Sequence, residues 1–387
     1  MQFIDLGAQQ KRIRQQIETN ISNILDHGKY IMGPEVAQLE DELKAFVGVP
    51  HAIACASGTD ALLLALLAEG VGPGDAVFTS PFTFIATAEV ISLVGATPVF
   101  VDIEEKTYNI DPDRLDSAIK ALRGADCAIH PLPRGVSSLS ELNPRGIIAV
   151  DLFGLPADYE RINAVAHRQD MFVIEDAAQS FGAEANGKKA CSLSDMACTS
   201  FFPAKPLGAY GDGGMCFTDS DRLAEAMQSL RVHGKGHHKY DNIRIGINGR
   251  LDTIQAAILL AKFEIFAEEI EMRQKVARNY SERLISHPAL VTPEIPAGYK
   301  SAWAQYSILA DDETQRSELQ DSLNQNGIPT AIYYPKPLHL QTAFASLGYL
   351  AGDFPRSEDF ALRIFSLPMH PYLTEDEQDK IASILEN

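Results

Sequence analysis

A lysine in a restricted backbone is the first residue whose surroundings could do chemistry. Lys205 lies in FFPAKPLGAYGDGG, residues 201–214, with a proline on each side of the pair Ala204–Lys205. The prolines remove freedom that a surface lysine normally keeps. Partial burial lowers the pKa of a lysine and makes its neutral amine available for Schiff-base chemistry. The alternative is a solvated lysine in a turn, which is the commoner case for a lone lysine.

The glycine-rich half of this segment follows the lysine. Its glycines are Gly208, Gly211, Gly213 and Gly214. Because glycine has no side chain, we expect these positions to let the backbone approach a flat ligand closely.

A carboxylate pair is the second candidate. Glu175 and Asp176 close the apolar run MFVIED, residues 171–176, and Gln179 follows three residues later. In open parallel sheets ligands bind at the carboxyl ends of the strands. A carboxylate there could hold a positively charged ring nitrogen, and Gln179 could reach the same ligand. The alternative is a cap, with Asp176 opening the next turn.

The third candidate is SGTDA, Ser57 to Ala61, where an expected strand ends and a helix begins. Backbone N–H groups at a helix start, the hydroxyl of Thr59 and the missing side chain of Gly58 would together cradle a phosphate. The alternative is a plain N-cap by Ser57 or Thr59, the better explanation for this motif alone. Pyridoxal 5′-phosphate (PLP), however, needs all three features: a phosphate cradle, a carboxylate for its ring nitrogen and a lysine for its aldehyde.

The elements that must position these residues alternate along the chain. Isoleucines at helical spacing predict a helix over 8–26, a second helix follows over 35–46, and one long helical pattern covers about 250–286. Between them, buried strands are expected at 51–57, 75–80, 97–103, 145–154, 171–176 and 196–202, with helices over 59–70 and 83–95. This alternation predicts an α/β fold with a parallel-rich sheet covered by helices on both faces.

The length of 387 residues fits one large and one smaller domain. We expect a large PLP-binding domain with the N-terminal helix over 1–250, and the long helix plus a small α/β domain over 251–387. The irregular stretch 121–147 is expected to be a surface connection.

Composition excludes several classes of protein. The 33 basic and 52 acidic residues give a net charge of −19, which disfavours nucleic acid and membrane-surface partners. Five cysteines without a CxxC pair argue against a disulfide framework or a zinc site. His233 and His237 are four residues apart, but Gly234 and Gly236 would spoil a helix there, so no metal is expected. No apolar signal or spanning segment is evident, so we expect a cytoplasmic protein.

Five motifs carry a resemblance to a known family. SGTDALLLAL, TFIATAEV, VIEDAAQSFGA, SFFPAKPLGAYGDGG and INGRLDTIQAA resemble the successive motifs of the DegT/DnrJ-type sugar aminotransferases. The resemblance runs from GKYIMGPE to SLPMHPYL and implies a fold-type I PLP transferase. That fold has a mostly parallel seven-stranded sheet between helices and a smaller C-terminal α/β domain. The sequences of these motifs are most similar to those of members acting on UDP-linked 3-keto-N-acetylglucosaminuronic acid.

The resemblance implies a role for each matched residue. Lys205 would form the Schiff base and shuttle a proton, Asp176 would pair with the pyridinium nitrogen, and Gln179 would lie near the ring hydroxyl. The other expected cofactor contacts are Gly58, Thr59, Asp60, Phe84, which would stack on the ring, Ser200, and Asn248, which would reach the phosphate from the neighbouring subunit. The smallest competent unit would then be a homodimer with shared active sites.

The resemblance also suggests the substrates. L-glutamate would give its amino group to a keto-sugar nucleotide for surface polysaccharide (O-antigen, lipopolysaccharide) biosynthesis. Arg250 and Tyr30 are candidate substrate contacts, and Arg250 could equally form a structural ion pair. Tyr333 is a third candidate and a departure, because many members have histidine there. The alternatives are a sugar dehydratase, whose relatives carry histidine in place of Lys205, and a non-catalytic regulator on the same fold.

Overall fold

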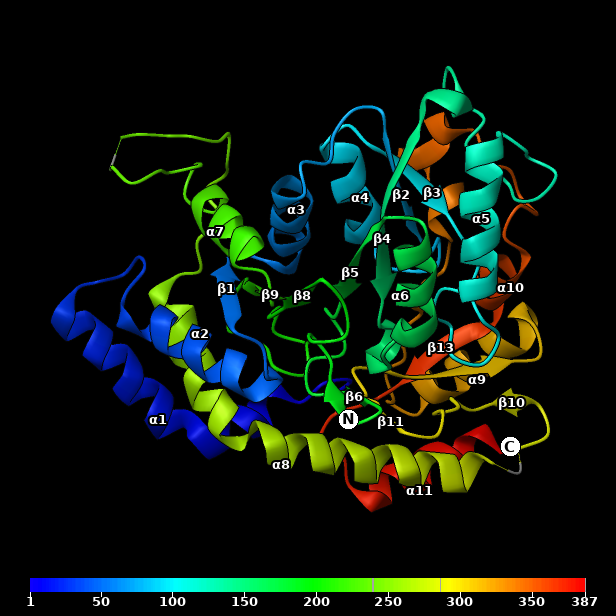
Figure 1. The fold of residues 1–387 in the computed structure, drawn as a ribbon. Helices are drawn as coiled ribbons and strands as arrows, with labels where there is room; N and C mark the ends of the chain where they lie inside the picture. The colour runs from blue at the N-terminus through cyan, green and yellow to red at the C-terminus, as the bar shows by residue number, and fades with distance from the viewer. Residues whose placement is uncertain (239, 286, 387) are drawn as a thin grey trace.

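The centre of the molecule is a seven-stranded sheet with helices on both faces (Figure 1). The computed structural model describes residues 1–238, 240–285 and 287–386. In spatial order the strands are β1 (His51–Cys55), β9 (Gly214–Thr218), β8 (Met196–Ser200), β5 (Phe172–Asp176), β4 (Asn143–Val150), β2 (Asp75–Thr79) and β3 (Thr97–Phe100). Only β9 runs antiparallel to its neighbours, β1 and β8. The predicted mostly parallel seven-stranded sheet is therefore confirmed.

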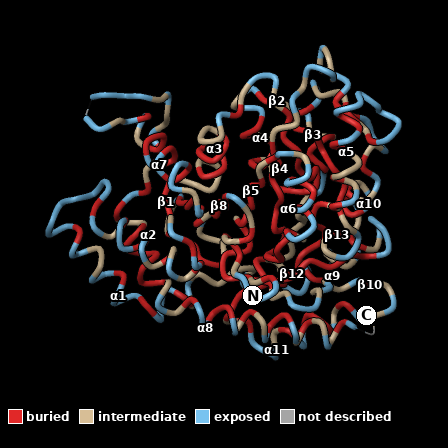
Figure 2. Tube along the Cα trace, viewed as in Figure 1, coloured by how far each residue is buried: buried red, intermediate tan, exposed pale blue. Residues whose placement is uncertain are grey.

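The two faces of the sheet are covered by different helices, because its strands are apolar on both sides. One face packs against α3 (Gly58–Ala68), α4 (Ala86–Leu93) and α7 (Asp221–Leu230). The other face packs against α5 (Pro112–Gly124) and α6 (Tyr159–Arg168). Figure 2 shows these buried segments concentrated around the sheet.

Three helices form a layer beside the sheet. These are α1 (Leu6–His27), α2 (Pro34–Val47) and the 32-residue α8 (Thr253–Leu284), which runs along one side of the molecule (Figure 1). Apolar residues of α1, including Ile13 and Ile17, pack on Ile258 and Ala261 of α8. The three predicted helices are confirmed, although the expected end of the third at residue 286 lies outside the described residues.

The C-terminal part builds its own antiparallel sheet from β10 (Leu290–Val291), β12 (Tyr306–Ala310) and β13 (Ile364–Leu367). Its helices are α9 (Glu313–Gln325), α10 (Pro355–Arg363) and α11 (Glu375–Leu385). A second small sheet joins β11 (Tyr299–Lys300) to β6 (Glu184–Ala185) and β7 (Lys188–Lys189). Short 3₁₀ helices lie at Leu139–Glu141, Leu152–Gly154, Leu338–Leu340 and Thr342–Leu347.

The prediction of a surface connection over 121–147 was wrong in part. Its first residues end α5, and its last residues begin β4. Between them His130 is buried against the carbonyl oxygen of Phe100 at 2.8 Å. Further along, Arg134 pairs with Asp353 at 2.6 Å, so this stretch is packed onto the C-terminal part of the chain.

Among the helices within residues 1–238, 240–285 and 287–386, none is both long and apolar enough to cross a membrane.

Candidate active site

Asp176 forms the floor of the candidate site at the carboxyl end of β5. Its carboxylate accepts a hydrogen bond from the hydroxyl of Thr87 at 2.8 Å and one from the backbone N–H of Ala178 at 3.3 Å. Burial raises the pKa of Asp176, and the two hydrogen bonds and Lys205 oppose that rise. The bond to Ala178 is the bond that a capping residue would make, so Asp176 begins a turn. The same carboxylate also interacts with the charge of Lys205.

The neighbouring carboxylate on the same strand has a different environment. Glu175 accepts hydrogen bonds from the backbone N–H groups of Cys191, at 2.6 Å, and Leu193, at 3.0 Å. Since successive side chains of a strand point to opposite faces, Glu175 holds a loop while Asp176 faces the lysine.

Lys205 lies in a turn just after β8, where its backbone N–H donates to the carbonyl oxygen of Phe202 at 2.9 Å. The residue is half-buried. Burial lowers the pKa of Lys205, and the negative charge of Asp176 acts in the opposite direction. The amine is thus easier to deprotonate than that of a surface lysine, and the residue is not fully closed off from solvent, as nucleophilic chemistry requires.

Gln179 is held by two groups that the sequence did not reveal. Its side-chain oxygen accepts from the backbone N–H of Phe153 at 2.7 Å, and its Nε2 donates to the Tyr334 hydroxyl at 3.2 Å. The rings of Phe84 and Tyr334 lie 6.4 Å apart, so the predicted stacking residue is near Gln179.

The turn at Ser57 adjoins the end of β8. The side chain of Ser57 caps α3 by accepting from the N–H of Asp60 at 3.0 Å, which confirms the capping interpretation. A Cβ placed on Gly58 would lie 2.7 Å from the Cβ of Ser200, so only glycine permits this approach. A helix start is thereby brought against a serine hydroxyl, and such a combination of donors suits a phosphate.

The expectation that Gly208, Gly211, Gly213 and Gly214 make room for a ligand was wrong. A Cβ on Gly208 would lie 2.5 Å from the oxygen of Pro203, and one on Gly214 would lie 2.3 Å from the oxygen of Ser57. A Cβ on Gly211 would meet the side chain of Gln255, and one on Gly213 would meet the side chain of Leu251. The glycines let the loop fold tightly onto its own chain.

Three other predicted residues are exposed. Phe84, near Tyr334, is 56% exposed. Tyr30, which is 47% exposed, and Asn248, which is also exposed, lie on a rim formed by the segments GKYIMGPE and INGRLDT. The backbone places this rim beside the phosphate turn, since Ala56 donates to the oxygen of Gly249 at 3.0 Å. Thr253 likewise donates to the oxygen of Tyr30 at 3.1 Å, which brings GKYIMGPE next to INGRLDT.

Two predicted substrate contacts differ in their partners. The Nε of Arg250 is buried and has no hydrogen-bond partner among the described residues. The ring of Tyr333 is half-buried and lies 6.4 Å from that of Phe3 at the N-terminus.

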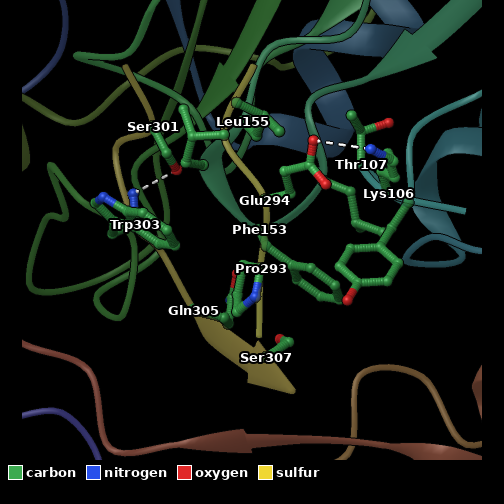
Figure 3. Close-up of a pocket in the computed structure, with 13 residues that line it drawn as sticks. Lys106, Thr107, Phe153, Leu155, Pro293, Glu294, Ser301, Trp303, Gln305 and Ser307 are labelled. Atoms are coloured by element: carbon green, nitrogen blue, oxygen red, sulfur yellow. Dashed lines mark hydrogen bonds and ion pairs between the residues drawn. The ribbon is translucent and has the colours of Figure 1, made fainter. Parts of the chain in front are cut away.

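The loop that carries Phe153 rests against the C-terminal part of the chain. Figure 3 shows the pocket between them, with Phe153, Pro293 and Gln305 facing it and the 3.1 Å ion pair of Lys106 with Glu294 at one side. Ala302 donates to the oxygen of Gly154 at 2.8 Å, so this contact also fixes the loop backbone.

The described side chains that could bind a metal ion do not gather in one place. Within the residues that the structure describes, no group of three or more His, Cys, Asp or Glu side chains could hold a metal ion.

Comparisons with known proteins agree with this geometry. The profile of the DegT/DnrJ/EryC1/StrS aminotransferase family matches residues 11–386. A UDP-2-acetamido-2-deoxy-3-oxo-D-glucuronate aminotransferase of Pseudomonas aeruginosa is 47% identical over 387 residues, covering 100% of both chains. A crystal structure of a DegT DnrJ EryC1 StrS aminotransferase from Brucella abortus is 50% identical, with a TM-score of 0.93 and coverage of 100% of this chain and 98% of that one. A Bacillus subtilis structure with bound cofactor PMP is 28% identical, with a TM-score of 0.85 and coverage of 99% and 82%.

Proposed function

Because this chain belongs to the DegT/DnrJ/EryC1/StrS aminotransferase family, we propose that it moves the amino group of L-glutamate to the 3-keto carbon of a UDP-linked 2-acetamido-2-deoxy-3-oxo-glucuronic acid. The observation that carries the choice of sugar is the 47% identity, over the whole length of both chains, with the P. aeruginosa aminotransferase of that name.

The cofactor is PLP, as the family and the cofactor-bound relative indicate. The residues present fit it, because a helix start against Ser200, a buried carboxylate and a half-buried lysine stand at neighbouring strand ends. The backbone around Gly58, Thr59 and Asp60, with Ser200, would hold the phosphate. Phe84 would cover the ring. When bound, PLP supplies the electron sink through which an amino group passes between two substrates.

The chain's own groups then perform the proton steps. Asp176, which Thr87 and Ala178 help to keep ionised, holds the proton on the ring nitrogen. Lys205 would move a proton between the Cα of the amino donor and the C4′ atom of the cofactor, and again on the sugar side. Its lowered pKa makes the amine easier to deprotonate than that of an ordinary lysine. Gln179 would contact the ring hydroxyl.

Arg250 is the proposed partner of the sugar carboxylate. Its buried Nε lacks a partner within the described residues, and a guanidinium pairs well with a carboxylate. Tyr30 and Tyr333 are the other two proposed sugar contacts.

The sugar assignment is tested with the holoenzyme, L-glutamate and two 3-keto sugars, one with a C6 carboxylate and one with a C6 hydroxymethyl group. We expect kcat/KM for the uronic acid to be at least about tenfold higher, measured as 2-oxoglutarate formed. Arg250→Gln should remove that preference, and the matched control Arg244→Gln, whose side chain pairs with Glu225, should retain it. Equal use of both sugars by the unchanged enzyme would exclude the uronic acid assignment.

A homodimer with shared active sites is the proposed assembly, because Asn248 is exposed on the rim and would serve the neighbouring subunit's phosphate. Lys205→Ala and Asn248→Asp variants can be unfolded and refolded together. If Asn248 acts in the partner's site, mixed dimers contain one intact site and regain activity that neither parent has. Activity no higher than that of the parents would argue against sharing.

Neither alternative is favoured. Some dehydrating relatives carry histidine where this chain has Lys205, and a non-catalytic regulator needs no lysine beside a buried carboxylate.

We further propose that 1–250 and 251–387 are the two domains, that the enzyme is cytoplasmic, and that its product enters surface polysaccharide.

A further inference from the structure

Tyr334 belongs to a different part of the chain than Asp176 and Gln179, near which it lies in the candidate site. It follows Ala331, which pairs with Ser366 of β13 in the C-terminal sheet. Its ring packs 6.4 Å from the rings of Phe82 and Phe84, which belong to the segment between β2 and α4. The C-terminal part thus places a phenol at the carboxyl ends of the large sheet.

The hydroxyl of this phenol contacts the Gln179 amide. Gln179 lies 155 residues earlier in the chain, is buried, and donates from Nε2 to the Tyr334 hydroxyl at 3.2 Å. Burial raises the pKa of Tyr334, and the charge of Asp176 acts in the same direction, so the phenol is neutral. The phenol therefore lies within reach of the electric field of the Asp176 carboxylate.

The amide of Gln179 is fixed from both sides. Its oxygen accepts from Phe153, whose loop is pressed on the C-terminal part through the bond of Ala302 to Gly154. A side-chain amide has two N–H groups, and one of them is used by Tyr334. The second N–H then has a defined direction, which a freely rotating glutamine would lack.

From these contacts we propose that Tyr334 is a positioning residue that orients the Gln179 amide toward the ring hydroxyl of PLP and so sets how tightly and in which ionic form the cofactor is held. This rests on the proposed role of Gln179. It makes the cofactor pocket depend on a residue that the C-terminal part supplies, next to the substrate candidate Tyr333.

The test uses Tyr334→Phe, which keeps the ring and removes only the hydroxyl. The apoprotein is titrated with PLP, and the visible absorption of the reconstituted protein is followed against pH. We expect the Kd for PLP to rise about two- to tenfold, the range of one neutral hydrogen bond, and the pH midpoint of the absorption band to move. Tyr306→Phe is the matched control, because it removes a tyrosine hydroxyl of the C-terminal sheet whose side-chain hydrogen bond within the described residues is with Ser281, at 2.9 Å, and it should leave both quantities unchanged.

A double-mutant cycle with Gln179→Ala shows whether the two residues act together. If Tyr334 acts through Gln179, the double variant binds PLP no more weakly than Gln179→Ala alone. Effects that multiply, or a Tyr334→Phe protein with unaltered Kd and spectrum, would overturn the proposal. An unaltered Gln179→Ala protein would overturn it as well. These readouts need no sugar, so a wrong substrate assignment would leave them intact.

Discussion

Lys205 and Lys262 are two lysines that the fold withdraws from water, and burial lowers the pKa of both. Lys205 lies half-buried in the turn after β8 and faces the charge of Asp176. Lys262 lies on α8, is 1% exposed, and has its Nζ 4.2 Å from the centre of the Tyr210 ring. Its Nζ has no hydrogen-bond partner within the described part of the chain.

The difference shows that a lowered pKa does not by itself make a catalytic lysine. Lys262 is the more deeply buried of the two, and its pKa falls to about 8, but it lies next to the closely packed α1–α8 interface. The charge of a carboxylate opposes this lowering at both lysines, Asp176 at Lys205 and Glu269 at Lys262. Lys205 is only half-buried, whereas Lys262 is 1% exposed, so access for a ligand is what distinguishes the environment of Lys205.

The largest expected effect comes from removing the proposed catalytic amine. Lys205→Ala should lower the rate of amino transfer from L-glutamate at least about 10³-fold, because both the covalent link and the proton shuttle are lost. Lys262→Met should keep near-normal activity. Turnover is measured as 2-oxoglutarate formed, and circular dichroism checks that both variants fold. A Lys205→Ala enzyme with substantial turnover would remove the distinction between the two lysines.

The carboxylate opposite Lys205 should come next. Asp176→Asn keeps the shape and removes the charge that stabilises a protonated ring nitrogen, so we expect a fall in kcat of about 10²- to 10³-fold. The matched control is Glu175→Gln, since that side chain lies on the opposite face of β5, where it accepts from backbone N–H groups of a loop and contacts the buried carboxyl of Asp151. Glu175→Gln should alter the melting temperature more than kcat. The reverse pattern would exchange the roles of the two acids.

Thr87 should have a smaller effect that depends on pH. Its hydroxyl lowers the pKa of Asp176, which burial otherwise raises. Without it, as in Thr87→Val, Asp176 takes up a proton at higher pH, so the acid limb of the pH–kcat profile should move upward. The loss at neutral pH should be about tenfold, typical of a hydrogen bond to a charged group. An acid limb at the same pH as in the unchanged enzyme would exclude this role.

Much of this site could be predicted from local sequence. Strand-end positions and the residue types of SGTDA, Asp176 and Lys205 indicated a PLP pocket, because each motif is contiguous. Tyr334 could not be predicted, since its contact with Gln179 spans 155 residues and depends on how the C-terminal sheet packs. Thr87 lies within TFIATAEV, and a threonine four residues after Thr83 among apolar residues was an available signal, since both are buried and their hydroxyls lie 3.2 Å apart. The glycines were misinterpreted because the sequence reveals the missing side chain but not which atoms approach it.

The last prediction concerns Lys262 and is a change in stability. In the folded chain its pKa is about 8, against 10.5 for an ordinary lysine, so below pH 8 folding must hold a charge away from water. Between about pH 8 and 10.5 the unfolded chain retains the proton and the folded chain releases it, so this penalty disappears as pH rises. Lys262→Met removes the penalty and should raise the free energy of unfolding at pH 7 by about 1–3 kcal/mol, and the gain should shrink toward pH 10.

Urea unfolding at both pH values measures this gain in stability. The control is Lys275→Met, at an exposed lysine paired with Glu375, which is expected to change stability by less than about 0.5 kcal/mol. A Lys262→Met protein less stable than the original at pH 7 would mean that the contact with Tyr210 outweighs desolvation. Lys262 would then be a stabilising cation, and burial alone would no longer explain the lowered pKa that the two lysines share.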